Sequence, residues 1–188
     1  MMLAPINARQ LILRHLKYKG VGAEIGVHKG DFSASILLAV RPTKLYLVDP
    51  WEHFETPEHQ KSLYGGASTT PEIMQERYEA VRQRFDRQAS AGTIEIVRER
   101  SANAAARFDD QSLDFAYIDG DHTKAGVTAD IEAYWPKVRI GGVMAFDDYS
   151  LTGWWEDGVV SPVHQLLASK PTLLVLAMDG QVVVRKVK

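Results

Sequence analysis

Short apolar segments alternate along the chain with segments whose apolar residues recur at helical spacing. Residues 21–27 form a short, glycine-bounded run rich in β-branched residues, which predicts a buried strand. The same pattern predicts four further strands, at residues 44–48, 93–97, 113–118 and 141–146. Helical spacing predicts helices at residues 5–18, 31–40, 71–88, 101–108, 123–136 and 162–169. This alternation is typical of an α/β protein with a mostly parallel sheet.

Local signals mark two helix starts and a terminal hairpin. We expect Asp31 to cap the helix after the first strand, and Thr70 to cap the helix that begins at Pro71. Asp179-Gly180 lies between the apolar segments 172–178 and 181–187. An Asp-Gly pair in this setting predicts a β-hairpin, which would add one antiparallel strand to the doubly wound sheet.

The length of 188 residues favours one domain over 1–188. Within it we expect a leading helical segment in residues 1–20 and a closing hairpin at 172–187. Residues 50–70 are aromatic and rich in glycine, serine and threonine, which predicts a long loop. Long loops in compact domains usually carry function, so this loop is a candidate lid.

Acidic residues follow most of the predicted strands. In open α/β sheets, ligands bind outside the carboxyl ends of the strands. The acids expected at or near these ends are Glu24, Asp49, Asp119, Asp147 and Asp148. An acidic rim favours a ligand that carries positive charge.

The turn after the first strand contains Gly26 and Gly30, where the absence of side chains lets a ligand approach the backbone. This turn lacks the G-x-G-x-x-G pattern of dinucleotide-binding proteins, and Glu24 would repel a pyrophosphate. Asp49, about 20 residues on, can accept hydrogen bonds from ribose hydroxyls. The alternative is structural: the glycines serve only a tight turn, and Asp49 caps the turn before Pro50.

Four motifs in register resemble the class I S-adenosylmethionine-dependent methyltransferases. They are Glu-x-Gly-x-x-x-Gly at 24–30, Leu-Val-Asp at 47–49, Asp-Gly-Asp-His at 119–122 and Gly-Gly-Val…Asp-Asp-Tyr at 141–149. The resemblance implies a seven-stranded Rossmann-like sheet with one antiparallel strand. It implies that Glu24, Gly26 and Gly30 line the methionine part of S-adenosylmethionine and that Asp49 holds the ribose. It places the adenine beside Ser101, Ala102 and Trp51, with Asp119 also at the cofactor.

A second acidic group combines Asp119 with the pair Asp147 and Asp148. Neighbouring strand ends lie about 5 Å apart, so three carboxylates there need a raised pKa or a cation. Oxygen ligands suit a hard ion such as Mg²⁺, and a neutral His122 suits a general base. The structural alternative is that these residues are turn and cap residues or pair with Lys or Arg.

The pattern Asp-x-x-His followed by an acidic pair resembles the metal-dependent O-methyltransferases that act on macrolide-linked sugars. It is also similar to catechol-type O-methyltransferases, in which a lysine stands where this chain has His122. The resemblance implies Asp119, Asp147 and Asp148 as metal ligands, His122 as the base and Asp119 as part of the catalytic centre.

Several aromatic and histidine residues allow two interpretations. His53 and Phe54 form either a lid over the ligand or a loop packing its own aromatics. Trp154 and Trp155 suit a wall against a sugar-like acceptor, but exposed aromatic pairs also mark subunit interfaces, so a homodimer is possible. Ordinary surface or packing positions are expected for three histidines, namely His15, His59 and His164.

Composition narrows the function classes. The absence of cysteine excludes disulfides, thiol nucleophiles and cysteine metal sites. A formal net charge of −2 gives no reason to expect nucleic-acid binding. No apolar run approaches the roughly 18–20 residues of a membrane span, and the N-terminal residues do not resemble a signal peptide. We therefore expect a cytoplasmic protein that acts on a small molecule, without nucleic acid or membrane partners.

Three hypotheses remain from the sequence. The first is methyl transfer from S-adenosylmethionine to a hydroxyl, with Mg²⁺ holding the acceptor. The second is a catalytically silent cofactor-binding or scaffold protein, which suits a short chain with little room for a substrate domain. The third is a nicotinamide-dependent oxidoreductase, which the missing glycine fingerprint disfavours.

Overall fold

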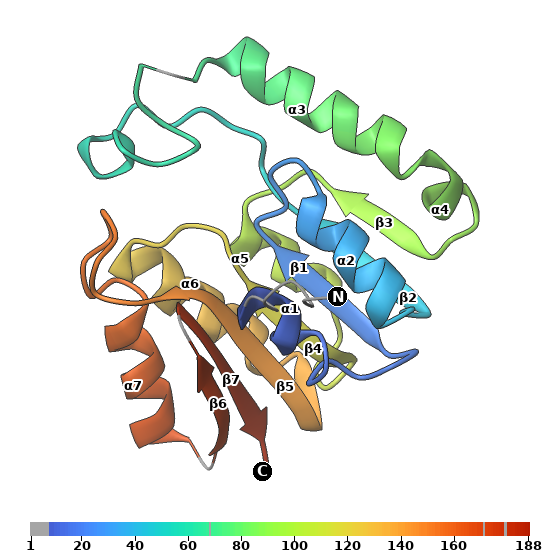
Figure 1. Ribbon diagram of the computed structural model, residues 1–188, viewed down its shortest axis with the longest axis vertical. Helices are drawn as coiled ribbons and strands as arrows, with labels where there is room; N and C mark the ends of the chain where they lie inside the picture. The colour runs from blue at the N-terminus through green and yellow to red at the C-terminus, as the bar shows by residue number, and fades with distance from the viewer. Residues whose placement is uncertain (1–7, 68, 171, 179) are drawn as a thin grey trace, which may run out of the picture.

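The central element is one mixed β-sheet. The computed structural model describes residues 8–67, 69–170, 172–178 and 180–188. Seven strands pair in the order β3-β2-β1-β4-β5-β7-β6. Their bounds are β1 Val21–Ile25, β2 Lys44–Val48, β3 Ile94–Val97, β4 Leu113–Ile118, β5 Val138–Tyr149, β6 Thr172–Met178 and β7 Gly180–Lys186. β7 pairs antiparallel with both β5 and β6, and the other strand pairs of the sheet are parallel. The predicted architecture with a C-terminal hairpin is therefore confirmed (Figure 1). The predicted turn residue Asp179 lies outside the described residues.

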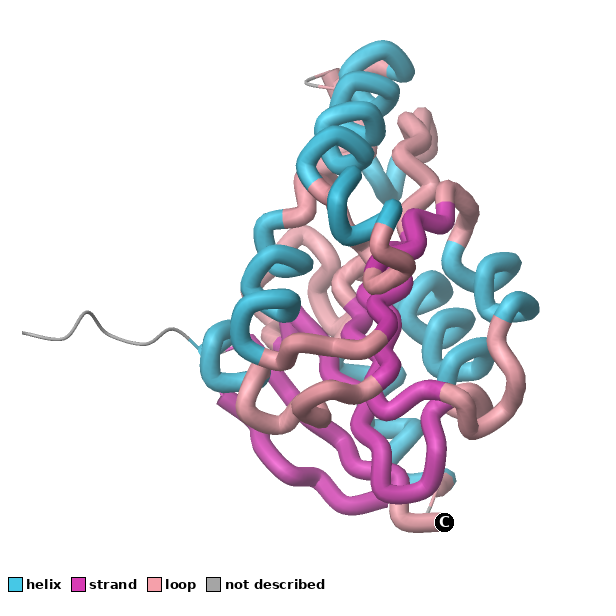
Figure 2. The backbone as a smooth tube through the Cα atoms, turned by 90° about the vertical axis from the view of Figure 1, so that its right-hand side faces the viewer, coloured by secondary structure: helices cyan, strands magenta, loops and turns pink. Residues whose placement is uncertain are grey.

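Helices cover both faces of this sheet (Figure 2). One face carries α1 Ala8–Ile12, α2 Asp31–Ala39 and α3 Pro71–Arg84, which share one buried cluster with β2 and β4. The other face carries α5 Ser101–Ala104, α6 Lys124–Tyr134 and α7 Val160–Ser169, which share the second cluster. Shorter elements are the helix α4 Asp86–Ser90 and the 3₁₀ turns η1 Pro57–His59 and η2 Ala105–Arg107. Because β4 is buried on both faces along its whole length, it is the centre of the core.

Four local predictions need correction. Gly30, at φ +77°, stands at the N-cap of α2, and Asp31 instead pairs with Arg84 at 2.6 Å. The helix expected over 71–88 is interrupted at Phe85, whose backbone leaves helical geometry and whose ring is buried.

The strand expected over 141–146 extends from Val138 to Tyr149. Its register against β4 shifts between Leu113 and Phe115, opposite the stretch that contains the Gly-Gly pair. The helix expected over 5–18 covers only Ala8–Ile12 within the described residues, and residues 1–7 lie outside them. Thr70 does cap α3, because its hydroxyl accepts the N–H of Ile73. In the described part of the chain, no helix combines the length and the apolar character that crossing a membrane requires.

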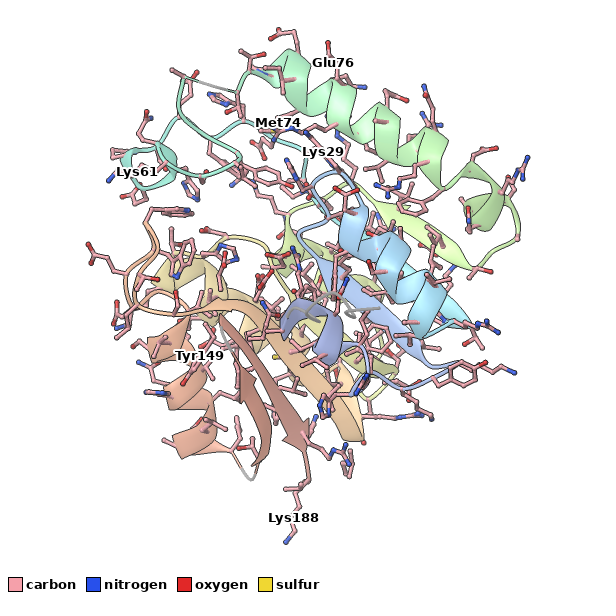
Figure 3. All side chains as sticks on the ribbon, viewed as in Figure 1. Lys29, Lys61, Met74, Glu76, Tyr149 and Lys188 are labelled. Carbon is pink, nitrogen blue, oxygen red and sulfur yellow. The ribbon has the colours of Figure 1, made fainter. Side chains whose placement is uncertain are left out.

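Two loops extend from the carboxyl ends of the strands. Residues 50–70 follow β2, and residues 150–159 follow β5. Figure 1 shows the two loops approaching one another beyond the sheet, although they are about 100 positions apart in the chain. Lys61 on the first loop and Tyr149 at the root of the second are labelled in Figure 3. Both loops therefore lie at the edge of the sheet where open α/β sheets bind ligands.

Candidate active site

Gly26 allows the ends of β1 and β4 to meet. Its φ is +89°, and a Cβ there would lie 1.9 Å from the backbone oxygen of Asp119. Gly30 is also at positive φ, and its Cβ would lie 2.6 Å from the ring of Phe85. Both glycines are therefore required by the backbone and its packing. Gly26 also lines a cavity. Gly30 instead packs against the ring of Phe85, the residue that follows α3.

Asp49, at the end of β2, organises the glycine loop. Its buried carboxylate accepts the N–H groups of Val27, His28 and Trp51 at 2.7–2.9 Å. The hydroxyl of Tyr64 also donates to it. Burial raises the pKa of this carboxyl, against the effect of the four donors. Because its oxygens already have these partners, a ribose would have to share them.

A cavity of about 350 Å³ lies outside the ends of β1, β2 and β4. It brings together four of the predicted cofactor residues, which are Gly26, Asp49, Ser101 and Ala102. Trp51 is not among the residues that line it. The Trp51 ring is buried against Tyr78, and its indole N–H donates to the carbonyl of His28 at 2.9 Å. Trp51 has a φ of +42°, and its side chain belongs to the buried core, so the structure does not support its predicted place beside the adenine.

Side chains from both long loops close this cavity. Phe54 and His59 reach it from the loop after β2, and Trp154 reaches it from the loop after β5. His59 lies 3.3 Å from Asp121, and its other ring nitrogen is 2.6 Å from the hydroxyl of Thr56. We expected His59 to be an ordinary surface or packing residue, but it joins the loop to the end of β4. His53 instead bonds Thr69, within its own loop.

Glu24 is a buried acid without a full set of partners. It is 1% exposed, and one of its carboxylate oxygens has no hydrogen-bond partner among the described residues. Burial raises the pKa of Glu24 to about 8. A cationic group brought close to this carboxylate would offset that desolvation and favour the ionised form.

Asp130 lies behind the Ser101 side of the cavity. The hydroxyl of Ser101 donates to Asp130, and the second carboxylate oxygen is buried without a partner in the described part of the chain. Burial raises the pKa of Asp130 to about 7. This residue was not singled out from the sequence, although an acid between Val127 and Ile131 on the apolar face of a helix is a detectable signal.

His122 stands between two carboxylates at the end of β4. Its Nδ1 is 3.3 Å from Asp148, and its Nε2 is 3.5 Å from Asp119 without forming a hydrogen bond. Burial lowers the pKa of His122, partly offset by the nearby carboxylates. The ring packs edge-on against Trp155, 5.3 Å between centroids. A neutral, buried imidazole with a free nitrogen is able to accept a proton.

The three predicted metal ligands are not gathered into one group. Ligand atoms of Asp119, His122 and Asp148 lie within 4.8 Å of one another. Asp147 stands apart from this group because Gln181 and the backbone N–H of Asp148 donate to one of its oxygens. The other oxygen is 3.1 Å from Arg9, which also pairs with Asp119. Sequence patterns gave no signal for Arg9, because it lies 110 positions from Asp119.

Comparison with known proteins decides the family. A family model described as "Methyltransferase domain" matches residues 23–149, which run from within β1 to the end of β5 and include the acids at the strand ends. The chain belongs to this methyltransferase family. No curated protein matches the sequence.

Solved structures share the fold of this methyltransferase at low sequence identity. The O-methyltransferase TomG from Streptomyces achromogenes, involved in tomaymycin synthesis and solved with SAM, has a TM-score of 0.63 and 15% identity over 96% of this chain and 78% of its own. A Streptococcus mutans protein solved with SAH has a TM-score of 0.63 and 12% identity over 100% of both chains. An rRNA methylase from Streptococcus thermophilus has a TM-score of 0.59 and 12% identity over 100% of this chain and 99% of its own. The fold therefore accommodates very different methyl acceptors.

Proposed function

We propose that this methyltransferase moves a methyl group from S-adenosylmethionine to a hydroxyl oxygen of a small molecule. The cavity at the carboxyl ends of β1, β2 and β4 supports the assignment of S-adenosylmethionine as the methyl donor, because this is where open α/β sheets bind ligands. Two proteins that share the fold are described as complexes with SAM and with SAH. S-adenosylmethionine carries a sulfonium and an ammonium group, which suit an acidic cavity mouth.

The proposed donor contacts follow the order of the strands. Gly26 lines the cavity where the methionine part would lie. Glu24, two residues before it, is buried outside the lining, and a nearby ammonium would favour its ionised form. Asp49 lies beside the ribose and fixes the glycine loop that surrounds it. Ser101 and Ala102 border the adenine. Gly30 acts indirectly, because it lets the loop pack on Phe85.

The environment of His122 is the observation that carries the proposed chemistry. It is a buried imidazole with a free nitrogen beside the cavity mouth, and carboxylates flank both of its ring nitrogens. In the proposed reaction the acceptor oxygen attacks the methyl carbon in line with the departing sulfur, and His122 takes the hydroxyl proton. Asp119 and Asp148 would stabilise the resulting imidazolium. Holding the methyl donor, the acceptor and the base in a fixed geometry lowers the entropic part of the activation free energy.

The predicted divalent cation, Mg²⁺, could be held only by Asp119, His122 and Asp148 among the described residues, and Arg9 already pairs with Asp119. When bound, it would polarise the acceptor oxygen and lower the pKa of its hydroxyl. An imidazole that donates its nitrogen to a cation cannot take a proton on that nitrogen. His122 therefore serves either as the base or as a ligand.

The acceptor side of the proposed site is aromatic. Trp154 and Trp155 meet edge to face, 5.9 Å between centroids, beside His122. Flat indole faces next to a proton acceptor suit a hydroxylated, sugar-like or natural-product acceptor. We propose this small-molecule class ahead of nucleic acid, because the formal net charge of −2 offers no general attraction to a phosphate backbone.

A methyl-transfer assay tests this proposal. Radiolabelled S-adenosylmethionine is incubated with a panel of sugars, phenols and amines and with His122→Ala. General bases contribute about 10²–10⁴-fold to rate, so His122→Ala should lose about that factor while donor affinity is retained. His164→Ala is the matched control, because His164 bonds Tyr149 on the surface. Equal turnover of the His122 variant and wild type would exclude His122 as the base.

A further inference from the structure

Arg9 occupies the space between two of the predicted metal ligands. Its guanidinium pairs with Asp119 through one nitrogen and lies 3.1 Å from Asp147 through another. The Nε also donates to the hydroxyl of Tyr117 at 2.9 Å. Both carboxylates are largely buried, whereas the Arg9 side chain is 39% exposed. One positive charge thus spans the ends of β4 and β5.

The guanidinium also stacks on an aromatic ring, in addition to pairing with the two carboxylates. Its central carbon lies 4.6 Å from the centre of the Phe32 ring, a distance typical of cation–π stacking. The helix that carries Arg9 is anchored by Ile12, whose side chain is fully buried in the core. Arginine suits such a site because its planar fork can bond two carboxylates and stack at once.

We propose that Arg9 is a built-in counter-ion that takes the place of a divalent cation at the Asp119–Asp147 edge. A cation entering beside Asp119 would meet a fixed positive charge and would have to compete for that carboxylate. With Arg9 in place one of the three negative charges is offset and Asp119 already has a cationic partner, so His122 is left free to take a proton. The consequence for catalysis, methyl transfer without added metal, rests on the proposed function. The competition between Arg9 and the cation does not rest on it.

Metal binding to the intact chain tests the competition directly. Mn²⁺ is titrated into wild type and Arg9→Gln, and free Mn²⁺ is followed by its EPR signal. Removing the guanidinium should tighten Mn²⁺ binding at least about tenfold, the change that corresponds to about 1.4 kcal/mol of repulsion. The Tm of Arg9→Gln should rise by about 4 °C in Mn²⁺ at ten times its Kd, with no comparable rise in wild type. Arg14→Gln is the matched control, since Arg14 is an exposed arginine on the same segment.

A double variant keeps the proposal testable if Arg9→Gln does not fold. Arg9→Gln combined with Asp147→Asn removes one charge of each sign and keeps Asp119, His122 and Asp148. Because Asp119 is released from Arg9, the affinity of this variant for Mn²⁺ should still exceed that of wild type. Equal Mn²⁺ affinity in wild type and the folded Arg9 variants would overturn the proposal. Tighter Mn²⁺ binding by wild type than by the variants would overturn it as well. Donor binding to wild type is measured separately. Absence of S-adenosylmethionine binding to wild type would refute the proposed function and leave the Mn²⁺ result interpretable.

Discussion

Replacing Gly26 with alanine tests whether the glycine loop is built around the meeting of β1 and β4. The new Cβ would lie 1.9 Å from the oxygen and 2.4 Å from the carbonyl carbon of Asp119. Neither partner can move freely, because the N–H of Asp119 donates to the carbonyl of Ile25 at 2.8 Å. The backbone would also have to keep alanine at φ +89°.

The expected cost has two parts. Holding alanine at positive φ costs about 1–2 kcal/mol, and overpacking against fixed backbone costs about 1–3 kcal/mol more. Gly92 is the matched control: its φ is +78°, and a Cβ there would meet nothing within 4 Å. Gly92→Ala should therefore cost only the first part, about 1–2 kcal/mol.

Urea unfolding of the two variants measures the difference. We expect Gly26→Ala to lose about 1–3 kcal/mol more than Gly92→Ala, or about 2–12 °C in Tm at about 2–4 °C per kcal/mol. Titration with S-adenosylmethionine should show weaker binding for Gly26→Ala alone, because Gly26 lines the cavity. Free energies of unfolding that agree within about 0.5 kcal/mol would refute the steric argument.

Three further predictions concern the cavity and its rim. Because burial raises the pKa of Glu24 to about 8, the stability linked to its protonated form is complete below pH 4.5 and lost as pH rises through about 8. Urea titrations from about pH 5 to 8.5 should show wild type losing up to ~4 kcal/mol relative to Glu24→Gln, whereas parallel curves would argue against a buried, protonated Glu24. Asp49→Ala should cost about 2–4 kcal/mol in urea unfolding, because it strands the N–H groups of Val27 and His28, and Asp31→Ala, at an exposed ion pair, should cost under about 1 kcal/mol. Trp154→Ala should raise the KM for the acceptor with little change in Tm, and an unchanged KM would remove Trp154 from the acceptor site.

The sequence was sufficient to locate the strands along the chain and the acids at their ends. Short apolar runs such as β4 are recognisable because a strand buried on both faces needs uninterrupted apolar residues. Asp49 and Asp119 were placed correctly because a carboxylate directly after such a run must lie at the sheet edge. Thr70 was identified as a cap for a similarly local reason, since the side chain bonds a backbone group three residues on.

Contacts between distant segments were beyond local patterns. Arg9 reaches Asp119 only because α1 packs across the sheet, and no spacing rule links positions 110 apart. The family resemblance placed Trp51 beside the adenine, but its ring is buried in the core against Tyr78. Phe85 interrupts a helix that its sequence would continue, because its ring fills the space beside Gly30. Each of these outcomes depends on tertiary packing.

Calorimetric titration with S-adenosylmethionine tests the central claim most directly. The intact protein is titrated with the methyl donor and, as the control ligand, with NAD. We predict micromolar binding of S-adenosylmethionine, weakened in Gly26→Ala, and no binding of NAD, because the glycine loop lacks the dinucleotide pattern. Absence of S-adenosylmethionine binding to the folded wild type would contradict the account and favour a catalytically silent protein.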